Sequence, residues 1–220
     1  MFDQKIDAII IIASFDRYNW LYQLLTNLNN QVSNYSYKII VLDDGSSDKR
    51  YSNLKNIFKI QYIKNRKNQG KCSYWQTITS ILTEVKKYNF EYLIQIDDDF
   101  DICDNFINVL LDEHIKQNNA IATVYSRNTQ EKRWGYSDFI DGGFVCNKKL
   151  LELINYTIPK RKCSSDIGSR VWQYITTIIN KNKFKIHLHP EILVTHLGYK
   201  DSKMNQEIRI KKNIVINKTL

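Results

Sequence analysis

Short apolar runs alternate with amphipathic segments over the first 126 residues of the chain. The apolar runs have the length of buried strands and cover residues 8–14, 37–43, 60–65, 91–97 and 120–126. The segments between them carry apolar residues at helical spacing and cover residues 17–31, 46–58, 70–88 and 104–117. Strands that alternate with helices in this way predict an α/β fold with a mainly parallel sheet and helices on both of its faces.

The pattern after residue 126 is less regular. It predicts a loop, a glycine pair, a short strand and a helix within residues 133–154, a helix at 165–180, and one or two short strands at 184–198. Beyond Tyr199 the chain is basic, and residues 208–216 fit a strand or a helix equally. With 220 residues the chain is long enough to bury one core of normal size.

The net charge of +9 is unevenly distributed along the chain. Residues 49–71 hold eight Lys or Arg and no acidic residue, and residues 200–220 hold six Lys or Arg against two acidic residues. Basic segments of this kind attract phosphates, whether in nucleic acid, on an anionic membrane surface or on a phosphorylated small molecule. Charge alone does not choose among these partners.

Targeting signals and cysteine spacing bear on where the protein works. The longest apolar run, residues 8–13, is far shorter than the roughly 20 residues that a membrane span needs. The N-terminal MFDQKID lacks a cleavable signal pattern. The four cysteines, Cys72, Cys103, Cys146 and Cys163, show no CxxC spacing. We therefore expect a cytoplasmic protein whose cysteines are free thiols.

Acidic residues gather where a predicted strand ends. Asp97, Asp98 and Asp99 close the fourth apolar run, and parallel sheets bind ligands at the carboxyl ends of their strands. Asp97 and Asp99 are spaced so that both carboxylates can reach one Mg²⁺ or Mn²⁺, cations that prefer oxygen ligands. His196, which follows an apolar strand in VTHLG, could add a nitrogen ligand. The alternative is a solvated turn in which the aspartates only cap a helix.

Two further segments could contact a nucleotide. In VLDDGSSD, Asp43 and Asp44 follow a strand and could accept hydrogen bonds from a base or a ribose, while Gly45 allows a tight turn. In NRKNQGK, Arg66 and Lys71 lie on either side of a glycine at a predicted helix start, where cations and backbone N–H groups suit a diphosphate. The alternatives are an ordinary turn with a helix cap and a solvated basic loop.

The order of these motifs resembles a known family. IIIIASFDR, VLDDGSSD, NQGK at a helix start and YLIQIDDDF follow one another as in the nucleotide-sugar-dependent glycosyltransferases of the GT-A fold, especially family 2. The resemblance covers residues 6–198. It implies a single GT-A domain over residues 1–199, with a nucleotide-sugar-binding half at 1–126, an acceptor-binding half at 127–199, and a basic tail at 200–220.

The resemblance assigns roles to individual positions. It implies contacts to the nucleotide sugar from Ser14, Asp16, Asp43, Asp44, Arg66, Lys71, Asp97 and Asp98. It also implies a Mn²⁺ or Mg²⁺ ion held by Asp97 and Asp99, which match the DxD motif of the family, and by His196. DGGFVCNKKLL resembles the acceptor segment of the family, so acceptor contacts are expected from Trp134, Tyr136, Gly142, Gly143 and Phe144.

The position of the catalytic base departs from the family pattern. Family members carry an ED motif before a helix, and the matching stretch here is SSDIGSRVW. On that alignment the usual carboxylate falls on Cys163 or Ser164, neither of which is a carboxylate. Asp166 is then the candidate base, with Asp141 as the runner-up and Asp138 after it.

The resemblance implies an inverting transferase that moves a sugar from a UDP-sugar to a hydroxyl of a glycan or lipid-linked glycan, as in polysaccharide, capsule or lipopolysaccharide synthesis. The basic segments would hold such a cytoplasmic enzyme peripherally at the anionic inner face of a membrane. A sugar nucleotidyltransferase is an alternative, although no Gly-rich basic loop follows the first strand. A non-catalytic basic protein that binds phosphate or nucleic acid is the other alternative. No RRM, KH or helix-turn-helix signature is present, so we expect no nucleic-acid partner.

Overall fold

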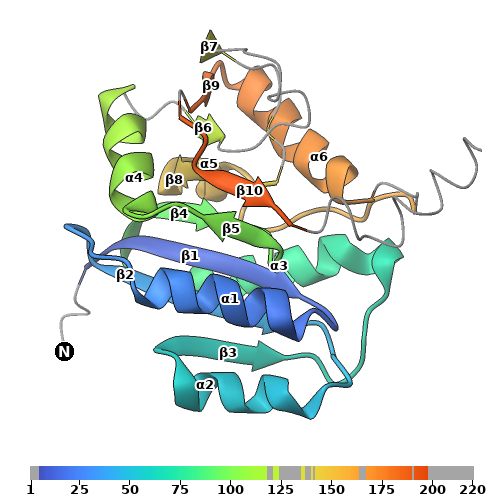
Figure 1. The fold of residues 1–220 in the computed structure, drawn as a ribbon. Coiled ribbons are helices and arrows are strands. Elements are labelled where there is room, and N and C mark those ends of the chain that lie inside the picture. The colour runs from blue at the N-terminus through green and yellow to red at the C-terminus, as the bar shows by residue number, and fades with distance from the viewer. Residues whose placement is uncertain are drawn as a thin grey trace, which may run out of the picture.

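An eight-stranded sheet forms the centre of the molecule (Figure 1). The computed structural model describes residues 5–117, 121–123, 135–136, 140, 142–163, 167–189 and 191–197. In sheet order the strands are β3 (Ile60–Lys64), β2 (Tyr37–Asp43), β1 (Ile6–Ser14), β4 (Phe90–Gln95), β8 (Phe144–Asn147), β6 (Ile121–Thr123), β9 (Ile186–Leu188) and β7 (Gly135–Tyr136). A separate small sheet pairs β5 (Phe100–Ile102) with β10 (Val194–His196).

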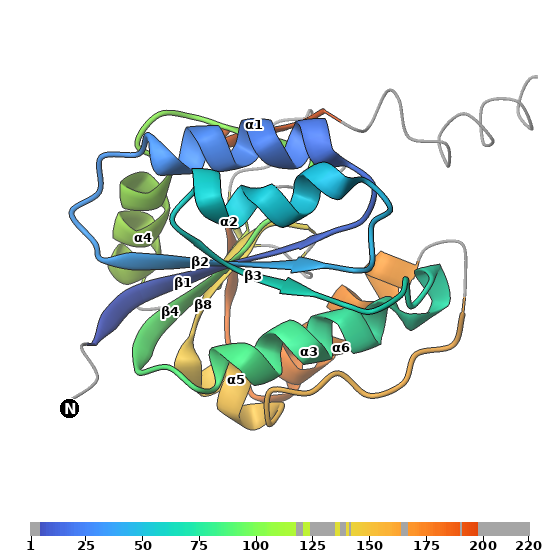
Figure 2. The same ribbon diagram turned by 90° about the horizontal axis from the view of Figure 1, so that it is seen from below.

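Helices cover both faces of the large sheet. They are α1 (Tyr18–Asn29), η1 (Lys49–Asn53), α2 (Leu54–Ile57), η2 (Lys71–Ser73), α3 (Tyr74–Val85), α4 (Phe106–Lys116), α5 (Lys148–Leu153) and α6 (Ile167–Lys181). In Figure 2, α1 and α2 lie on one side of the sheet, and α3, α5 and α6 lie on the other. Among the helices of the described residues, none combines the length and the apolar character that a membrane crossing requires.

The central strand β1 shows why both faces are covered. Successive side chains of a strand point to opposite faces of the sheet. Ile10 and Ile12 pack in the core that α1 and α4 cover, whereas Ile9 and Ile11 pack in the core under α3, α5 and α6. Each of these four side chains is at most 2% exposed. The unbroken apolar run of β1 is therefore what a strand buried on both faces requires.

The predicted α/β fold with a mainly parallel sheet is confirmed. β3, β2, β1 and β4 pair in parallel, and β8 runs antiparallel to β4 and β6. Two local predictions differ from the structure. The helix expected at 46–58 is two short segments, η1 and α2, and the strand expected at 91–97 ends at Gln95. The aspartates therefore lie in a turn beyond β4, which the unpredicted strand β5 follows directly.

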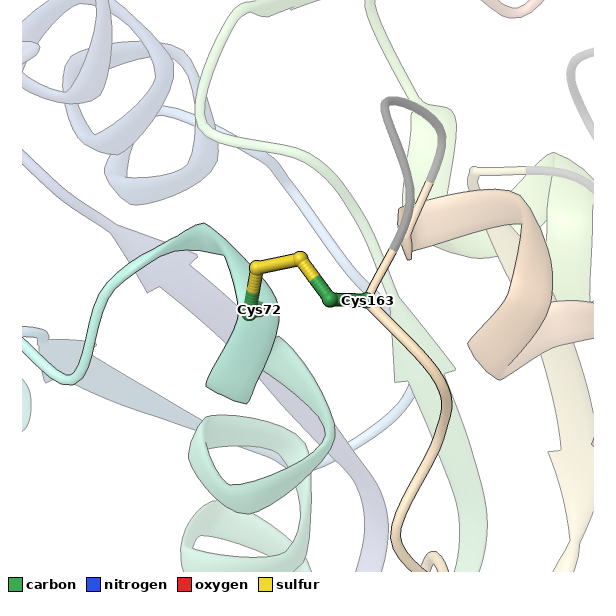
Figure 3. Close-up of a disulfide and its surroundings, with 2 residues drawn as sticks. All are labelled: Cys72 and Cys163. Carbon is green, nitrogen blue, oxygen red and sulfur yellow. A yellow bond between two sulfur atoms is a disulfide. The ribbon is translucent and has the colours of Figure 1, made fainter.

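The expectation that all four cysteines are free is wrong for two of them. Cys72 and Cys163 form a disulfide with their Cα atoms 4.7 Å apart (Figure 3), while Cys103 and Cys146 are free. The two cysteines are separated by 91 positions, so the pairing cannot be predicted from a local sequence motif. The fold joins them because η2, which contains Cys72 and leads into α3, lies beside the segment that ends at Cys163 before α6 (Figure 3).

Candidate active site

The carboxyl ends of β1, β2 and β4 lie next to one another. Ser14 and Asp43 are register partners at the ends of β1 and β2, and β4 pairs with β1 on the other side. The chain continues beyond β4 into the turn that carries Asp97, Asp98 and Asp99. The acidic residues of the sequence motifs therefore gather at one edge of the sheet, where α/β proteins bind their ligands.

Asp97, Asp99 and His196 form a group that could hold a metal ion. One ligand atom of each lies within 4.8 Å of the others. His196 reaches the group because β10 pairs with β5, and the backbone N–H of Leu197 donates to the carbonyl oxygen of Asp99 at 2.9 Å. Two carboxylates and one imidazole are ligands that Mn²⁺ accepts, and Mg²⁺ also prefers carboxylates.

One oxygen of Asp99 tests whether these residues fit a cation. Asp99 is 2% exposed, and its Oδ1 atom is buried and accepts no hydrogen bond from the described residues. The Nε2 atom of His196 lies 3.6 Å from this oxygen. A buried carboxylate oxygen without a donor is costly, and a cation among the three side chains would remove that cost. The residues present therefore fit a divalent ion.

Two features fix the position of the Asp97 carboxylate: a hydrogen bond from the Gln95 amide, and the absence of a Cβ atom at Gly142. Its Oδ1 atom accepts a hydrogen bond from Nε2 of Gln95 at 2.9 Å, and the backbone N–H of Gly143 donates to Oε1 of the same amide at 2.9 Å. A Cβ atom at position 142 would lie 2.2 Å from Oδ2 of Asp97. Gly142 therefore leaves the space that the Asp97 carboxylate occupies.

Arg17 lies against the other two aspartates. Its Nη1 atom donates to Oδ1 of Asp98 at 3.0 Å and to Oδ2 of Asp99 at 2.8 Å. Burial raises the pKa of Asp98 to about 6, although Arg17 acts in the opposite direction. Arg17 was not among the site residues predicted from the sequence. It is the only basic residue between the end of the first strand and the start of the second, and a buried acidic cluster requires a counter-charge.

The segment that follows β1 borders the site. Ser14 is buried with its Oγ atom 2.9 Å from the Tyr51 hydroxyl, and the exposed Asp16 accepts a hydrogen bond from the backbone N–H of Ser47 at 2.9 Å. Phe15, between them, is 43% exposed. The sequence does not reveal this exposure, because nothing there distinguishes Phe15 from a core residue. An exposed aromatic ring next to Ser14 and Asp16 is of the kind that can stack on a nucleotide base.

Asp43 and Asp44 are hydrogen-bonded within the protein. Asp43 is fully buried, accepts a hydrogen bond from the Tyr62 hydroxyl at 2.5 Å and lies 3.3 Å from Nζ of Lys64. Asp44 accepts a hydrogen bond from Nδ2 of Asn65 at 2.6 Å, and burial raises the pKa of Asp44. Both carboxylates fix the loops beside the site. Their contact with a base or a ribose stays a prediction.

Arg66 and Lys71 are exposed on the loop that joins β3 to α3. Lys71 begins η2, and the next residue, Cys72, forms the disulfide with Cys163. The bond thus ties the basic loop to the chain just before residues 164–166 (Figure 3). A role of the two cations at a diphosphate stays a prediction.

The acceptor-side predictions are only partly within the described residues. Trp134, Asp138, Asp141 and Asp166 lie outside them, and of Tyr136 the structure describes the backbone alone. The expectation that Phe144 stacks on an acceptor is corrected by its packing. Its side chain is 2% exposed, and its ring meets that of Trp172 edge to face at 5.5 Å between centroids. Phe144 is a core residue.

The sheet with helices on both faces, and the acidic residues beyond the carboxyl ends of its central strands, form an architecture of the GT-A type, which the solved structures described below share. The model of glycosyl transferase family 2 matches residues 9–187. The chain belongs to glycosyl transferase family 2. No curated protein matches the chain.

Solved structures share the fold at low sequence identity. TarS 1-349 of S. aureus superposes with a TM-score of 0.64 at 14% identity, covering 89% of this chain and 62% of that one. The same fragment in complex with UDP-GlcNAc gives 0.66 at 12% identity, covering 88% and 61%. The mannosyltransferase PcManGT from Pyrobaculum calidifontis, in complex with GDP-Man and Mn²⁺, gives 0.67 at 13% identity, covering 96% and 63%. The chain therefore spans less than two thirds of these neighbours.

Proposed function

We propose that the protein is an inverting glycosyltransferase that moves a sugar from a UDP-sugar to a hydroxyl of a glycan or lipid-linked glycan, with a divalent metal. The observation that carries the proposal is the group of Asp97, Asp99 and His196 at the carboxyl edge of the sheet. Structural neighbours support a nucleotide-sugar donor, since TarS is seen with UDP and UDP-GlcNAc, and PcManGT with GDP-Man and Mn²⁺.

The donor side would stabilise the leaving diphosphate. A Mn²⁺ or Mg²⁺ ion, when bound, supplies positive charge against the diphosphate oxygens. Asp97, Asp99 and His196 would hold that ion, and Arg66 and Lys71 would add cationic side chains. Ser14, Asp16, Asp43, Asp44 and Asp98 complete the donor contacts that we propose.

The acceptor side would remove a proton. As the acceptor hydroxyl attacks the anomeric carbon, a carboxylate must take its proton, and attack from the face opposite the diphosphate inverts the configuration. We assign this role to Asp166, with Asp141 second. We also assign residues 1–126 to the donor and 127–199 to the acceptor, whose contacts would come from Trp134, Tyr136, Gly142 and Gly143.

Thermal melts with UDP, GDP and CDP, each with and without Mn²⁺, test the donor side. A ligand at a hundred times its Kd stabilises by about 2.7 kcal/mol. A chain of this size should then melt about 5–10 °C higher. A rise that needs both UDP and Mn²⁺, and is lost in Asp99→Ala, supports the proposal. A rise with GDP alone moves the donor to a GDP-sugar, and no rise with any nucleotide contradicts the function.

The catalytic base is tested by turnover. Asp166→Asn and Asp141→Asn are compared for sugar transfer and for the UDP-dependent rise in melting temperature. The variant that loses transfer but keeps the UDP-dependent rise identifies the base. Its asparagine side chain leaves the binding of UDP unchanged, but an amide cannot accept the proton of the acceptor hydroxyl. Full transfer by both variants would rule out both residues.

The basic surface suggests where the acceptor lies. All eight Lys and Arg of residues 49–71 have exposed side chains. We propose that this segment holds the protein at an anionic membrane surface, where lipid-linked acceptors are found. Tight RNA binding with a steep salt dependence would instead favour a nucleic-acid-binding function.

A further inference from the structure

Arg17 has two carboxylate partners that differ in kind. Its Nη1 atom lies 3.0 Å from Oδ1 of Asp98 and 2.8 Å from Oδ2 of Asp99. Asp99 belongs to the candidate metal group, and Asp98 does not. Both carboxylates are almost fully buried, with side chains 2% and 6% exposed, whereas the Arg17 side chain is 39% exposed. Arg17 therefore is a partly exposed cation that neutralises charge on two buried carboxylates.

The two oxygens of Asp99 face different partners. Oδ2 accepts the hydrogen bond from Arg17, and Oδ1 is the buried oxygen beside His196. A carboxylate can rotate about its bond to Cβ, so a hydrogen bond to one oxygen fixes where the other points. Hydrogen bonds from outside the ligand set are the usual means of orienting metal ligands. The bond from Arg17 thus keeps Oδ1 of Asp99 turned toward His196, another member of the candidate metal group, whose Nε2 atom lies 3.6 Å away.

The charge of Arg17 explains why a third carboxylate, Asp98, lies beside the two candidate metal ligands. An arginine that contacted Asp99 alone would cancel half of the negative charge that Asp97 and Asp99 offer to a cation. Asp98 supplies the charge that balances Arg17, and the remaining two carboxylates match a divalent ion. Burying Asp98 beside Arg17 also avoids an uncompensated buried carboxylate.

We propose that Arg17 is a positioning residue for the metal ligand Asp99, and that Asp98 is the counter-ion that preserves the charge of the metal site. The inference rests on the proposed metal site. The competing explanation is a purely structural ion pair, since Arg17 also lies over the Trp20 ring at 5.3 Å. A structural pair would change stability, but it would not change metal affinity once charge is conserved.

The double variant Arg17→Gln/Asp98→Asn separates these explanations. It removes one charge of each sign and leaves the three metal ligands intact. We expect its affinity for Mn²⁺, measured by calorimetry without nucleotide, to fall about tenfold, as for other residues that orient metal ligands. The matched control is Arg50→Gln/Asp48→Asn, which removes an Arg–Asp pair at 2.7 Å whose Arg50 side chain is 59% exposed. Its Mn²⁺ affinity should equal that of the wild type.

A single variant, Asp98→Asn, tests the counter-ion separately and keeps the bond from Arg17 to Asp99. Its Mn²⁺ affinity should also fall, because Arg17 then offsets the charge of Asp99. Wild-type affinity in the double variant would overturn the positioning role, and wild-type affinity in Asp98→Asn would overturn the counter-ion role. If the wild type binds no Mn²⁺, both this inference and the metal in the proposed function fail.

Discussion

Space, as much as charge, places the carboxylates of the candidate site. Asp97 occupies its position because residue 142 has no side chain, and Gln95 holds the carboxylate from the other side. A single methyl group at position 142 would clash with Oδ2 of Asp97. The metal group should therefore respond to a substitution that adds no charge and removes no ligand.

Gly142→Ala should weaken Mn²⁺ binding by at least about tenfold, because the Asp97 carboxylate has to move away from the other ligands. Calorimetry on the purified variant measures this. The control is Gly168→Ala on α6, where an added Cβ meets nothing within 4 Å. That change should leave the affinity unaltered and stabilise the helix by about 0.5–1 kcal/mol. Equal Mn²⁺ affinity for Gly142→Ala and the wild type would show that Asp97 is not a ligand.

The residues found from sequence differ in kind from those that were missed. Asp97, Asp99 and His196 were predicted as metal ligands because their chemical types and their positions after apolar runs pointed to a cation, and the structure brings the three side chains together. Arg17 was missed because its role depends on carboxylates 81 and 82 positions away. Phe144 was misassigned because an aromatic ring looks the same in sequence whether it fills a core or faces a ligand.

At the scale of elements, the smallest sheet has the largest effect on the site. β5 and β10 are three residues each, yet their pairing carries His196 across to the aspartates. Long apolar runs predicted β1, β2 and β4 well, because a buried strand needs apolar residues on both faces. Three-residue strands leave almost no such pattern, so neither β5 nor its pairing with β10 could be derived.

Leu197→Pro tests the pairing of β10. The change removes the N–H that donates to the Asp99 carbonyl at 2.9 Å, next to His196. Proline cannot replace that donor. Mn²⁺ affinity should fall about tenfold through the displaced His196, whereas Leu197→Ala, which keeps the N–H, should bind as the wild type does. If the proline variant retains full affinity, the backbone bond does not position His196.

The disulfide between Cys72 and Cys163 should stabilise the protein. Closing a loop of this length restricts the unfolded chain, so Cys72→Ser/Cys163→Ser should lower the free energy of unfolding by about 2–4 kcal/mol under oxidising conditions. Urea unfolding with and without dithiothreitol measures the difference. Reductant should destabilise the wild type and Cys103→Ser but leave the double variant unchanged. Identical curves for all three proteins would show that the bond does not form in solution.

At the scale of the whole molecule, exposed basic residues are concentrated in one stretch of the sequence. Residues 49–71 span η1, α2, β3 and the loop before α3, and every basic side chain in this stretch is exposed. Composition already indicated a basic protein, but only the fold shows that these eight side chains are exposed. Two of them also pair with carboxylates, Lys64 with Asp43 and Arg50 with Asp48. Of these eight residues we propose Arg66 and Lys71 for the donor, so the other six are the ones to test at an anionic surface.

Replacing Lys49, Lys55, Lys59 and Lys67 with Gln should weaken co-sedimentation with phosphatidylserine-containing vesicles at low salt by at least about tenfold, since each lysine near such a surface contributes about 1 kcal/mol. The charge-matched control replaces four exposed lysines outside the stretch, Lys160, Lys162, Lys181 and Lys183. Equal losses in both variants would reduce the effect to net charge. No binding by the wild type would contradict membrane association.

The close approach of Gly142 to Asp97 also limits where the chain can be joined to part of a related protein in a chimera. β8 lies beside β4, and the residues just before β8 touch the aspartate turn that follows β4. A chimera that took its second half from a relative with a larger residue at this position would keep the fold and still disturb the donor side. When the second half of the chain is exchanged for that of a relative, the junction should therefore be placed after Gly143, in β8, so that Gly142 stays with Asp97. A junction before Gly142 would separate the two.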